Sequence, residues 1–172
     1  MSDLQIRKLN AGDAGAFKNL RIEAAHNSPA SLPMGPEELN QQPISDFERQ
    51  ICGPLQITFG AFVGAELIAV AGLRQEGKSK SRHRANIWGV YTKEDHRGQG
   101  IARHLVDMLI NEAKTNPEIT MLDLKVNSLN AHAKALYASL GFTRYGTQQN
   151  TLLVNGNYIH EELMDLSLEK PA

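Results

Sequence analysis

One short segment constrains the fold of this chain more than any other: a run of β-forming residues leads through a turn with two glycines into an amphipathic helix. The β-forming run ends at Thr92, the glycines are Gly98 and Gly100, and the apolar stripe of the helix begins at Ile101. Glycine has no Cβ, so it lets the backbone approach a ligand closely and adopt unusual dihedral angles. The first amides of a helix lack intrahelical partners, and together with the helix dipole they attract anions. The segment therefore predicts a phosphate-binding turn between a strand and a helix.

Other phosphate-binding motifs fit this segment poorly. The chain has no G-x-x-x-x-G-K-[ST] sequence, which argues against a nucleotide P-loop. It also has no G-x-G-x-x-G followed about twenty residues later by an acidic residue, which argues against a dinucleotide site. On two glycines alone, a plain turn before a helix is the simpler interpretation. Arg97 adds a positive charge to the turn, and the small Ala102 keeps the helix start open.

Apolar alternation and turn residues predict the strands. Ile57–Val63 and Glu66–Arg74 are separated by a glycine turn and are expected to form a hairpin, and Asn155-Gly156 is a strong signal for a second hairpin. The expected strands cover residues 4–6, 57–63, 66–74, 85–92, 121–126, 142–147, 151–154 and a last strand that ends near residue 168.

Capping residues and helical spacing predict the helices. Asp13 is expected to cap the first helix, and Ser45 with Glu48 fits a capping box at the start of the second. Between them, residues 28–43 are rich in proline and are expected to form an irregular surface stretch. The third helix is expected over residues 101–114, and a fourth is expected to begin after Asn130.

The order of these elements predicts the fold class. We expect an α/β domain of the α+β type, with a mixed, largely antiparallel central sheet of about seven strands flanked by about four helices. The chain has 172 residues and shows no repeat or linker, so residues 1–172 are expected to form one domain.

Composition and charge exclude some classes of function. The formal net charge is −1, which argues against a dedicated nucleic-acid-binding protein. The basic residues between 78 and 84 are best explained as a solvated hairpin tip, with a patch for an anionic partner as the alternative. Cys52 is the one cysteine, which indicates a reducing compartment, and we expect it to be partly buried and not nucleophilic. The sequence shows no signal peptide and no membrane-spanning run, so we expect a cytoplasmic protein without a membrane partner.

Two motifs in fixed order carry a family resemblance. The first is Arg97-Gly98-Gln99-Gly100-Ile101-Ala102, and the second is Asn130-Ala131-His132-Ala133 followed by Tyr137 and then Gly141-Phe142. Over residues 57–168 the chain resembles the GNAT superfamily of acyl-CoA-dependent N-acyltransferases, whose phosphate loop has the form [R/Q]-x-x-G-x-[G/A]. The resemblance implies the GNAT fold and an enzyme that transfers an acetyl group from acetyl-CoA to a primary amine by direct attack.

The resemblance also implies which residues bind acetyl-CoA. In the family, the backbone of the strand before the phosphate loop binds the pantetheine arm and the thioester carbonyl, the loop binds the pyrophosphate, and the asparagine helix lies near the pantetheine and adenosine. The matching residues here are Val90, Tyr91, Thr92, Arg97, Gly98, Gln99, Gly100, Ile101, Ala102, Asn130, Ala133 and Tyr137.

The resemblance implies one catalytic residue and leaves another open. Tyr137 matches the tyrosine that protonates the leaving thiolate, although a tyrosine at this spacing can also simply pack in the core. Some members place a glutamate base where this chain has Asn86. The candidates for the base are the run His160-Glu161-Glu162, from which we take Glu161, and water held near Asn127. No metal site is expected.

The acceptor is the least predictable feature. In this fold it is walled by the connection of the first helices and by the last hairpin, here residues 26–45 and 148–162. The amine belongs to a small molecule or to a peptide or protein, and acidic residues such as Glu37, Glu38 and Asp46 would suit a cationic amine. A homodimer is compatible with the sequence. The alternative functions are an acyl-CoA-binding sensor without turnover and, more weakly, a nucleic-acid-binding or anion-binding module built on residues 78–84.

Overall fold

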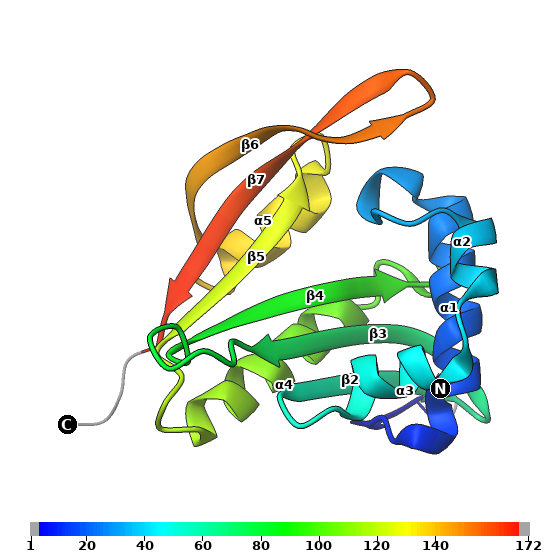
Figure 1. The fold of residues 1–172 in the computed structure, drawn as a ribbon, viewed down its shortest axis with the longest axis horizontal. Helices are drawn as coiled ribbons and strands as arrows, with labels where there is room; N and C mark the ends of the chain where they lie inside the picture. Colours follow the sequence, from blue (N-terminus) through cyan, green and yellow to red (C-terminus); the bar gives the residue numbers. More distant parts are fainter. Residues whose placement is uncertain (1–3, 169–172) are drawn as a thin grey trace.

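A computed structural model of the chain describes residues 4–168, in which seven strands form one sheet with the order β1-β2-β3-β4-β5-β7-β6 (Figure 1). Every neighbouring pair is antiparallel except β4 and β5, which run parallel. The prediction of a mixed, largely antiparallel sheet of about seven strands is confirmed. The strands are β1 Leu4–Lys8, β2 Gln56–Val63, β3 Glu66–Gln75, β4 Arg84–Thr92, β5 Met121–Asn127, β6 Thr143–Val154 and β7 Asn157–Ser167.

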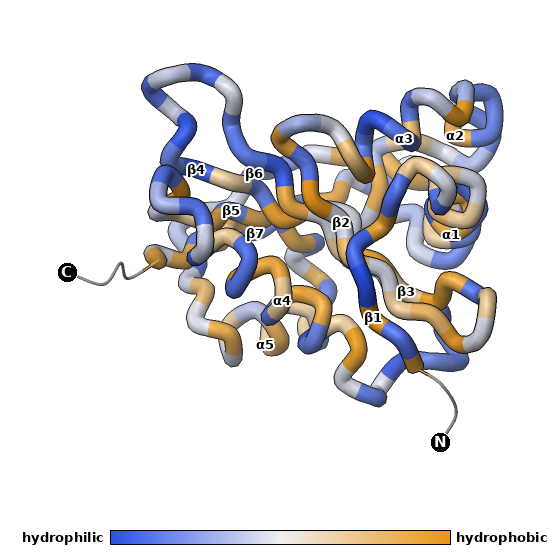
Figure 2. The backbone as a smooth tube through the Cα atoms, turned by 90° about the horizontal axis from the view of Figure 1, so that it is seen from below, coloured by the Kyte–Doolittle hydropathy of each residue, from blue (hydrophilic) through white to orange (hydrophobic). Residues whose placement is uncertain are grey.

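Helices cover both faces of the sheet and divide its apolar side chains into two clusters. One cluster joins α4 and α5 to the sheet, and its centre includes the fully buried Leu105, Leu109 and Leu122. The other joins the three N-terminal helices to β2, β3 and β4 around Phe17 and Phe47. Figure 2 shows the apolar segments of strands and helices gathered between these layers. The helices are α1 Ala14–Asn27, α2 Pro36–Gln41, α3 Ile44–Cys52, α4 Ile101–Thr115 and α5 Ala131–Ser139.

The sheet opens between β4 and β5. Among the described residues the two strands pair only where residues 84–86 face residues 121–123, and they diverge beyond that point (Figure 1). In the diverging part of β4 the register against β3 shifts by one residue, which is a β-bulge. Gly89 lies in this bulge with a φ of 65°, a left-handed conformation that glycine adopts without steric cost. The bulge bends β4 away from β5 and sets the shape of the opening.

The region between the first helix and β2 differs from expectation. Residues 28–43 are not wholly irregular, because α2 begins at Pro36, whose fixed φ suits the first helical position, and it buries Leu39. The predicted capping box is also wrong: α3 already begins at Ile44, after Pro43, so Ser45 lies inside the helix and makes no capping hydrogen bond.

Two further local predictions are corrected. Asp13 makes no side-chain cap for α1; its carboxylate instead accepts a hydrogen bond from the amide of Asn10, whose side chain caps the preceding single turn. Residues 143–154 form one long edge strand, not two short ones, because register shifts absorb the polar residues in its middle. Cys52 is exposed, not partly buried, at the end of α3, and its Sγ contacts the carbonyl of Glu48.

The basic residues 78–84 lie in the connection between β3 and β4 and at the start of β4. Arg82 forms an ion pair with Glu118 at 3.0 Å, and Arg84 pairs with Asp123 at the point where β4 and β5 still run together. These pairs neutralise part of the segment, in agreement with a solvated hairpin tip. Across residues 4–168, no helix is both long enough and apolar enough to pass through a bilayer.

Candidate active site

Three adjoining cavities follow the opening between β4 and β5. The first cavity, about 720 Å³, lies between the end of β4, the first turn of α4 and one side of α5. The second cavity, about 750 Å³, lies on the side of α3 and β6. A junction of about 110 Å³ shares residues such as Val90 and Tyr137 with the first cavity and residues such as Trp88 and Glu161 with the second. The cavities therefore form one passage through the opened sheet.

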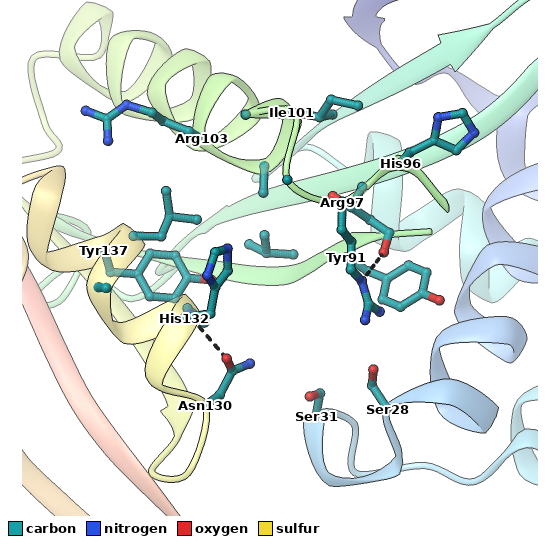
Figure 3. A pocket seen from close by; sticks show the side chains of 18 of the residues that line it. Ser28, Ser31, Tyr91, His96, Arg97, Ile101, Arg103, Asn130, His132 and Tyr137 are labelled. Carbon is teal, nitrogen blue, oxygen red and sulfur yellow. Dashed lines mark hydrogen bonds between the residues drawn. The ribbon is translucent and has the colours of Figure 1, made fainter. Parts of the chain in front are cut away.

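The glycine turn forms one wall of the first cavity (Figure 3). Gly98 has a φ of 75° and Gly100 a φ of 77°, so both lie in the left-handed region. A Cβ built at either position would meet no atom within 4 Å, which means that the space beside the turn is open to a ligand. Gly100 precedes α4, whose first amides have no intrahelical acceptor. The turn therefore has the backbone shape and the free donors that suit a phosphate.

Part of the backbone of β4 faces the opening, where among the described residues it pairs with no strand. The amide of Lys93 donates to the carbonyl of Ile68 on β3 at 2.9 Å, so the groups of Lys93 point toward β3. Successive residues of a regular strand point their backbone groups in opposite directions, so those of Thr92 point toward the opening. In agreement, the Thr92 carbonyl accepts a hydrogen bond from Nε of Arg97 at 3.0 Å, across the end of the strand. Val90 lies in the bulge without a partner on β3, and it lines the first cavity.

Most of the predicted cofactor-binding residues line the first cavity. Arg97 reaches back over the end of β4, where its guanidinium lies 5.6 Å from the centre of the Tyr91 ring. Asn130 caps α5, because its Oδ1 accepts a hydrogen bond from the amide of Ala133 at 3.0 Å. Gln99 is the exception and does not line the cavity. The predicted residues that do line it are Val90, Tyr91, Thr92, Arg97, Gly98, Gly100, Ile101, Ala102, Asn130, Ala133 and Tyr137.

Tyr137 lies where the first cavity meets the junction. Its ring packs edge-on against Phe142 at a centroid distance of 6.0 Å, and the residue is only 7% exposed. Burial raises the pKa of the Tyr137 hydroxyl to about 12, because an apolar environment disfavours the phenolate. The hydroxyl is therefore protonated at neutral pH, and it makes no hydrogen bond with any residue between 4 and 168.

The run of residues 160–162 is divided by the alternation of β7. Glu161 lines both the junction and the second cavity. His160 and Glu162 point to the opposite face, since side chains alternate along a strand. His160 Nδ1 accepts a hydrogen bond from the amide of Asn150 at 3.0 Å, and Glu162 forms an ion pair with Lys134 at 3.1 Å. The structure thus brings Glu161 to the passage with Tyr137 and holds the other two elsewhere.

The second cavity is lined by both stretches that were expected to wall the acceptor site. Leu32 and Met34 come from the connection after α1, and Gln148 and Leu152 come from β6. The acidic residues expected to attract an amine do not line it: α2 carries Glu37 and Glu38 outside the cavity, and Asp46 pairs with Arg49. Asn86 does line it, and its side-chain amide donates to the carbonyl of Asp123 at 3.3 Å.

Several residues that line the passage were not among the predicted site residues. The signal of Gly89 was a glycine inside a β-forming run, which often marks a bulge. Arg103 directly follows the first motif and His132 lies inside the second, within the first turns of α4 and α5, so both could have been inferred from helical position. Arg21 and Trp88 gave no local signal, because their burial depends on contacts between distant parts of the chain. The lining residues outside the predicted ones include Arg21, Trp88, Gly89, His96, Arg103 and His132.

Comparison with known proteins matches this geometry. The sequence profile described as "Acetyltransferase (GNAT) family" matches residues 22–142, which include α4, α5 and the glycine turn between β4 and α4. The chain belongs to the GNAT acetyltransferase family. It is accordingly an acetyltransferase with acetyl-CoA as the acetyl donor.

Individual relatives support the assignment to the GNAT family. N-alpha-acetyltransferase RimI from Mycobacterium tuberculosis is 30% identical over 115 residues, which are 66% of this chain and 69% of that protein. A GNAT-family acetyltransferase from Streptococcus pneumoniae has a TM-score of 0.86 at 19% identity, covering 97% of this chain and 100% of that one. The protein yncA from Salmonella typhimurium, solved with its cofactor acetyl-CoA, has a TM-score of 0.82 at 22% identity, covering 99% of this chain and 97% of that one. These structural likenesses show that the GNAT fold is shared over nearly the whole chain.

Proposed function

We propose that this GNAT acetyltransferase transfers an acetyl group from acetyl-CoA directly to a primary amine, and that transfer takes place in the junction. The observation that carries the proposal is the lining of the junction, where Tyr137 and Glu161 meet between two larger cavities. One cavity has the features of a donor site and the other has the walls expected for an acceptor site. A reaction between two bound substrates needs such a shared point of contact.

The first cavity suits acetyl-CoA. The left-handed glycines and the first amides of α4 would hold the pyrophosphate, for which the open space beside Gly98 and Gly100 leaves room. The opening side of β4, at Val90 and Thr92, would hold the pantetheine arm by backbone hydrogen bonds, as an added strand would. When bound, acetyl-CoA supplies an acetyl thioester, which is activated for transfer. A backbone amide of β4 that points at the thioester oxygen would stabilise the negative charge that develops there.

Tyr137 and Glu161 would move the protons. The acceptor nitrogen forms a bond to the thioester carbonyl carbon, and the carbon–sulfur bond breaks. Glu161 takes a proton from the acceptor nitrogen, while the Tyr137 hydroxyl gives one to the leaving sulfur and is later reprotonated from solvent. The products are the N-acetylated amine and CoA thiol. The burial that raises the pKa of Tyr137 to about 12 makes its hydroxyl a weaker acid, but the same burial raises the pKa of a thiol beside it, so the two effects on proton donation offset each other.

The transfer is proposed to be direct, without an acyl-enzyme. The sulfur of Cys52, the one cysteine in the chain, lies at the end of α3 and belongs to the lining of none of the three cavities. For the acceptor, the name of the RimI relative points to an α-amine, and the amino terminus of a peptide or protein is therefore one class of acceptor to test. A small-molecule amine is the other.

The experiment is to measure thiol release from acetyl-CoA with a panel of amines, beside calorimetric binding of acetyl-CoA. Release that depends on one class of amine supports the proposal and names the acceptor class. Binding of acetyl-CoA without release across small amines and peptide amino termini would contradict it and favour an acyl-CoA sensor. Absence of binding would contradict the assignment of the first cavity.

A further inference from the structure

Arg21 is a buried cation without a counter-ion in the described part of the chain. It lies on α1 and is 8% exposed, yet it forms no ion pair or hydrogen bond with any residue between 4 and 168. Its Nε is fully buried without an acceptor. Burial without an anionic partner lowers the pKa of the guanidinium to about 10, so it still carries its charge at neutral pH. Keeping such a charge out of water is costly unless a partner arrives.

The aromatic contacts of Arg21 leave its donors unsatisfied. The guanidinium carbon lies 5.7 Å from the centre of the Trp88 ring and 6.0 Å from that of Phe17. Aromatic rings interact with the face of a guanidinium, whereas its N–H groups radiate in the plane. These two contacts therefore place the guanidinium beside aromatic rings without providing an acceptor for its N–H groups.

The free donors of Arg21 face the passage. Arg21 lines both the junction and the second cavity, and Glu161 lines the same two spaces. Gly89 in the bulge of β4 lets the guanidinium of Arg21 come close to the strand, because a Cβ at this position would lie only 3.2 Å from Nη1 of Arg21. A cation and a carboxylate thus share a junction of about 110 Å³ without forming an ion pair with each other.

We propose that Arg21 binds a carboxylate of the acceptor, so that the acceptor is a small amine with a carboxylate close by, as in a free amino acid. A guanidinium and a carboxylate match each other in a planar, two-bond geometry. The acceptor carboxylate satisfies Arg21 while its amine faces Glu161 and the thioester. A peptide amino terminus lacks this feature, since its first carboxyl group is an amide. The inference rests on the proposed function, because it assigns a ligand to the same passage.

The test compares amino acids with their carboxamides, which have nearly the same size but no negative charge. For the wild-type protein we expect amino acids to exceed their amides in kcat/KM by about 10- to 100-fold, the range expected for a charged hydrogen bond. In Arg21→Met the ratio of kcat/KM for amino acids to kcat/KM for their amides should fall to about 1, and the affinity for acetyl-CoA should not change. Arg21→Lys should retain part of the preference. As a control, Lys18→Met removes a cation of the same helix that bonds the carbonyls of Asn40 and Gln42 and should leave the preference intact.

A wild-type experiment covers the case in which Arg21→Met does not fold. An α-hydroxy acid should inhibit competitively with the amine, and its carboxamide should not. Three results would overturn this inference alone: equal rates on acids and amides, equal inhibition by the two analogues, or an unchanged preference in a folded Arg21→Met. In each case thiol release would still establish the transferase. No release with any amine would overturn the proposed function and this inference together.

Discussion

Substitution of Gly72 by alanine adds a single methyl group and tests how tightly the wall of the passage is packed. Gly72 on β3 faces Trp88 on β4, and a Cβ added at Gly72 would lie 2.6 Å from Cζ2 and 2.7 Å from Nε1 of the indole, and closer still to Cε2. The ring cannot retreat freely, because it packs edge-on against Phe17 at a centroid distance of 6.1 Å and lies against the guanidinium of Arg21.

We therefore expect Gly72→Ala to destabilise the protein. Overpacking of a rigid core typically costs about 1–3 kcal/mol of the free energy of unfolding. In a domain of this size a loss of about 2 kcal/mol lowers Tm by roughly 4–8 °C. Gly15→Ala is the matched control: Gly15 lies on α1 with no atom within 4 Å of a built Cβ, so alanine should stabilise the helix by up to about 1 kcal/mol.

The assay is urea unfolding followed by circular dichroism, with Trp88→Phe added to close a double-mutant cycle. Removing the indole should relieve the clash, so the Gly72→Ala substitution should cost about 1–2 kcal/mol less in the Trp88→Phe background. A Gly72→Ala protein as stable as wild type, or a cycle without coupling, would refute the reasoning that Trp88 is packed directly on Gly72.

Four further expectations concern the passage itself. Gly100→Glu should abolish acetyl-CoA binding in calorimetry, whereas Gly64→Glu, at another left-handed glycine with open space around it, should not; equal affinities would contradict the phosphate-turn assignment. Tyr137→Phe should lower kcat roughly 10- to 1000-fold with little change in acetyl-CoA affinity, and full activity would show that Tyr137 only packs. Glu161→Gln should flatten the acid limb of the rate–pH profile while His160→Gln leaves it unchanged; the reverse result would exclude Glu161 as the base. Because burial raises the pKa of Tyr137 to about 12, the neutral hydroxyl contributes about 2–3 kcal/mol to the free energy of unfolding, and this contribution should be present below pH 10 and lost as the pH rises to 12. Unfolding of Tyr137→Phe, measured over the same pH range, should not show this loss.

The features that sequence predicted well are those fixed by local chemistry. The strands from Gln56 to Thr92 follow from alternating apolar residues, and α4 follows from a glycine turn and an apolar stripe. Asn130 could be predicted as a cap because its side chain bonds the amide only three residues away. The binding of a phosphate by the glycine turn stays a prediction, which the two motifs support because together they resemble the GNAT family.

The features that sequence missed depend on contacts between distant segments or on competing local signals. Arg21 lies on a helix where a charged residue normally faces water, and only the distant Trp88 and Gly89 show that it is buried. The proline-rich stretch concealed α2, because Pro36 both interrupts the preceding chain and starts the helix. The capping box failed because Pro43 sets the helix start two residues earlier than Ser45 would.

The narrow junction has a consequence for the kinetics. The glycine turn, the start of α4 and one side of α5 border one end of the passage, and α3 and β6 border the other. Under the proposed function, each substrate would therefore have its own entrance. Neither has to leave before the other enters, and initial-rate plots should intersect, with either order of addition allowed. A larger side chain in the junction should separate binding from turnover: both substrates would still saturate their sites, but the two reacting atoms would not meet.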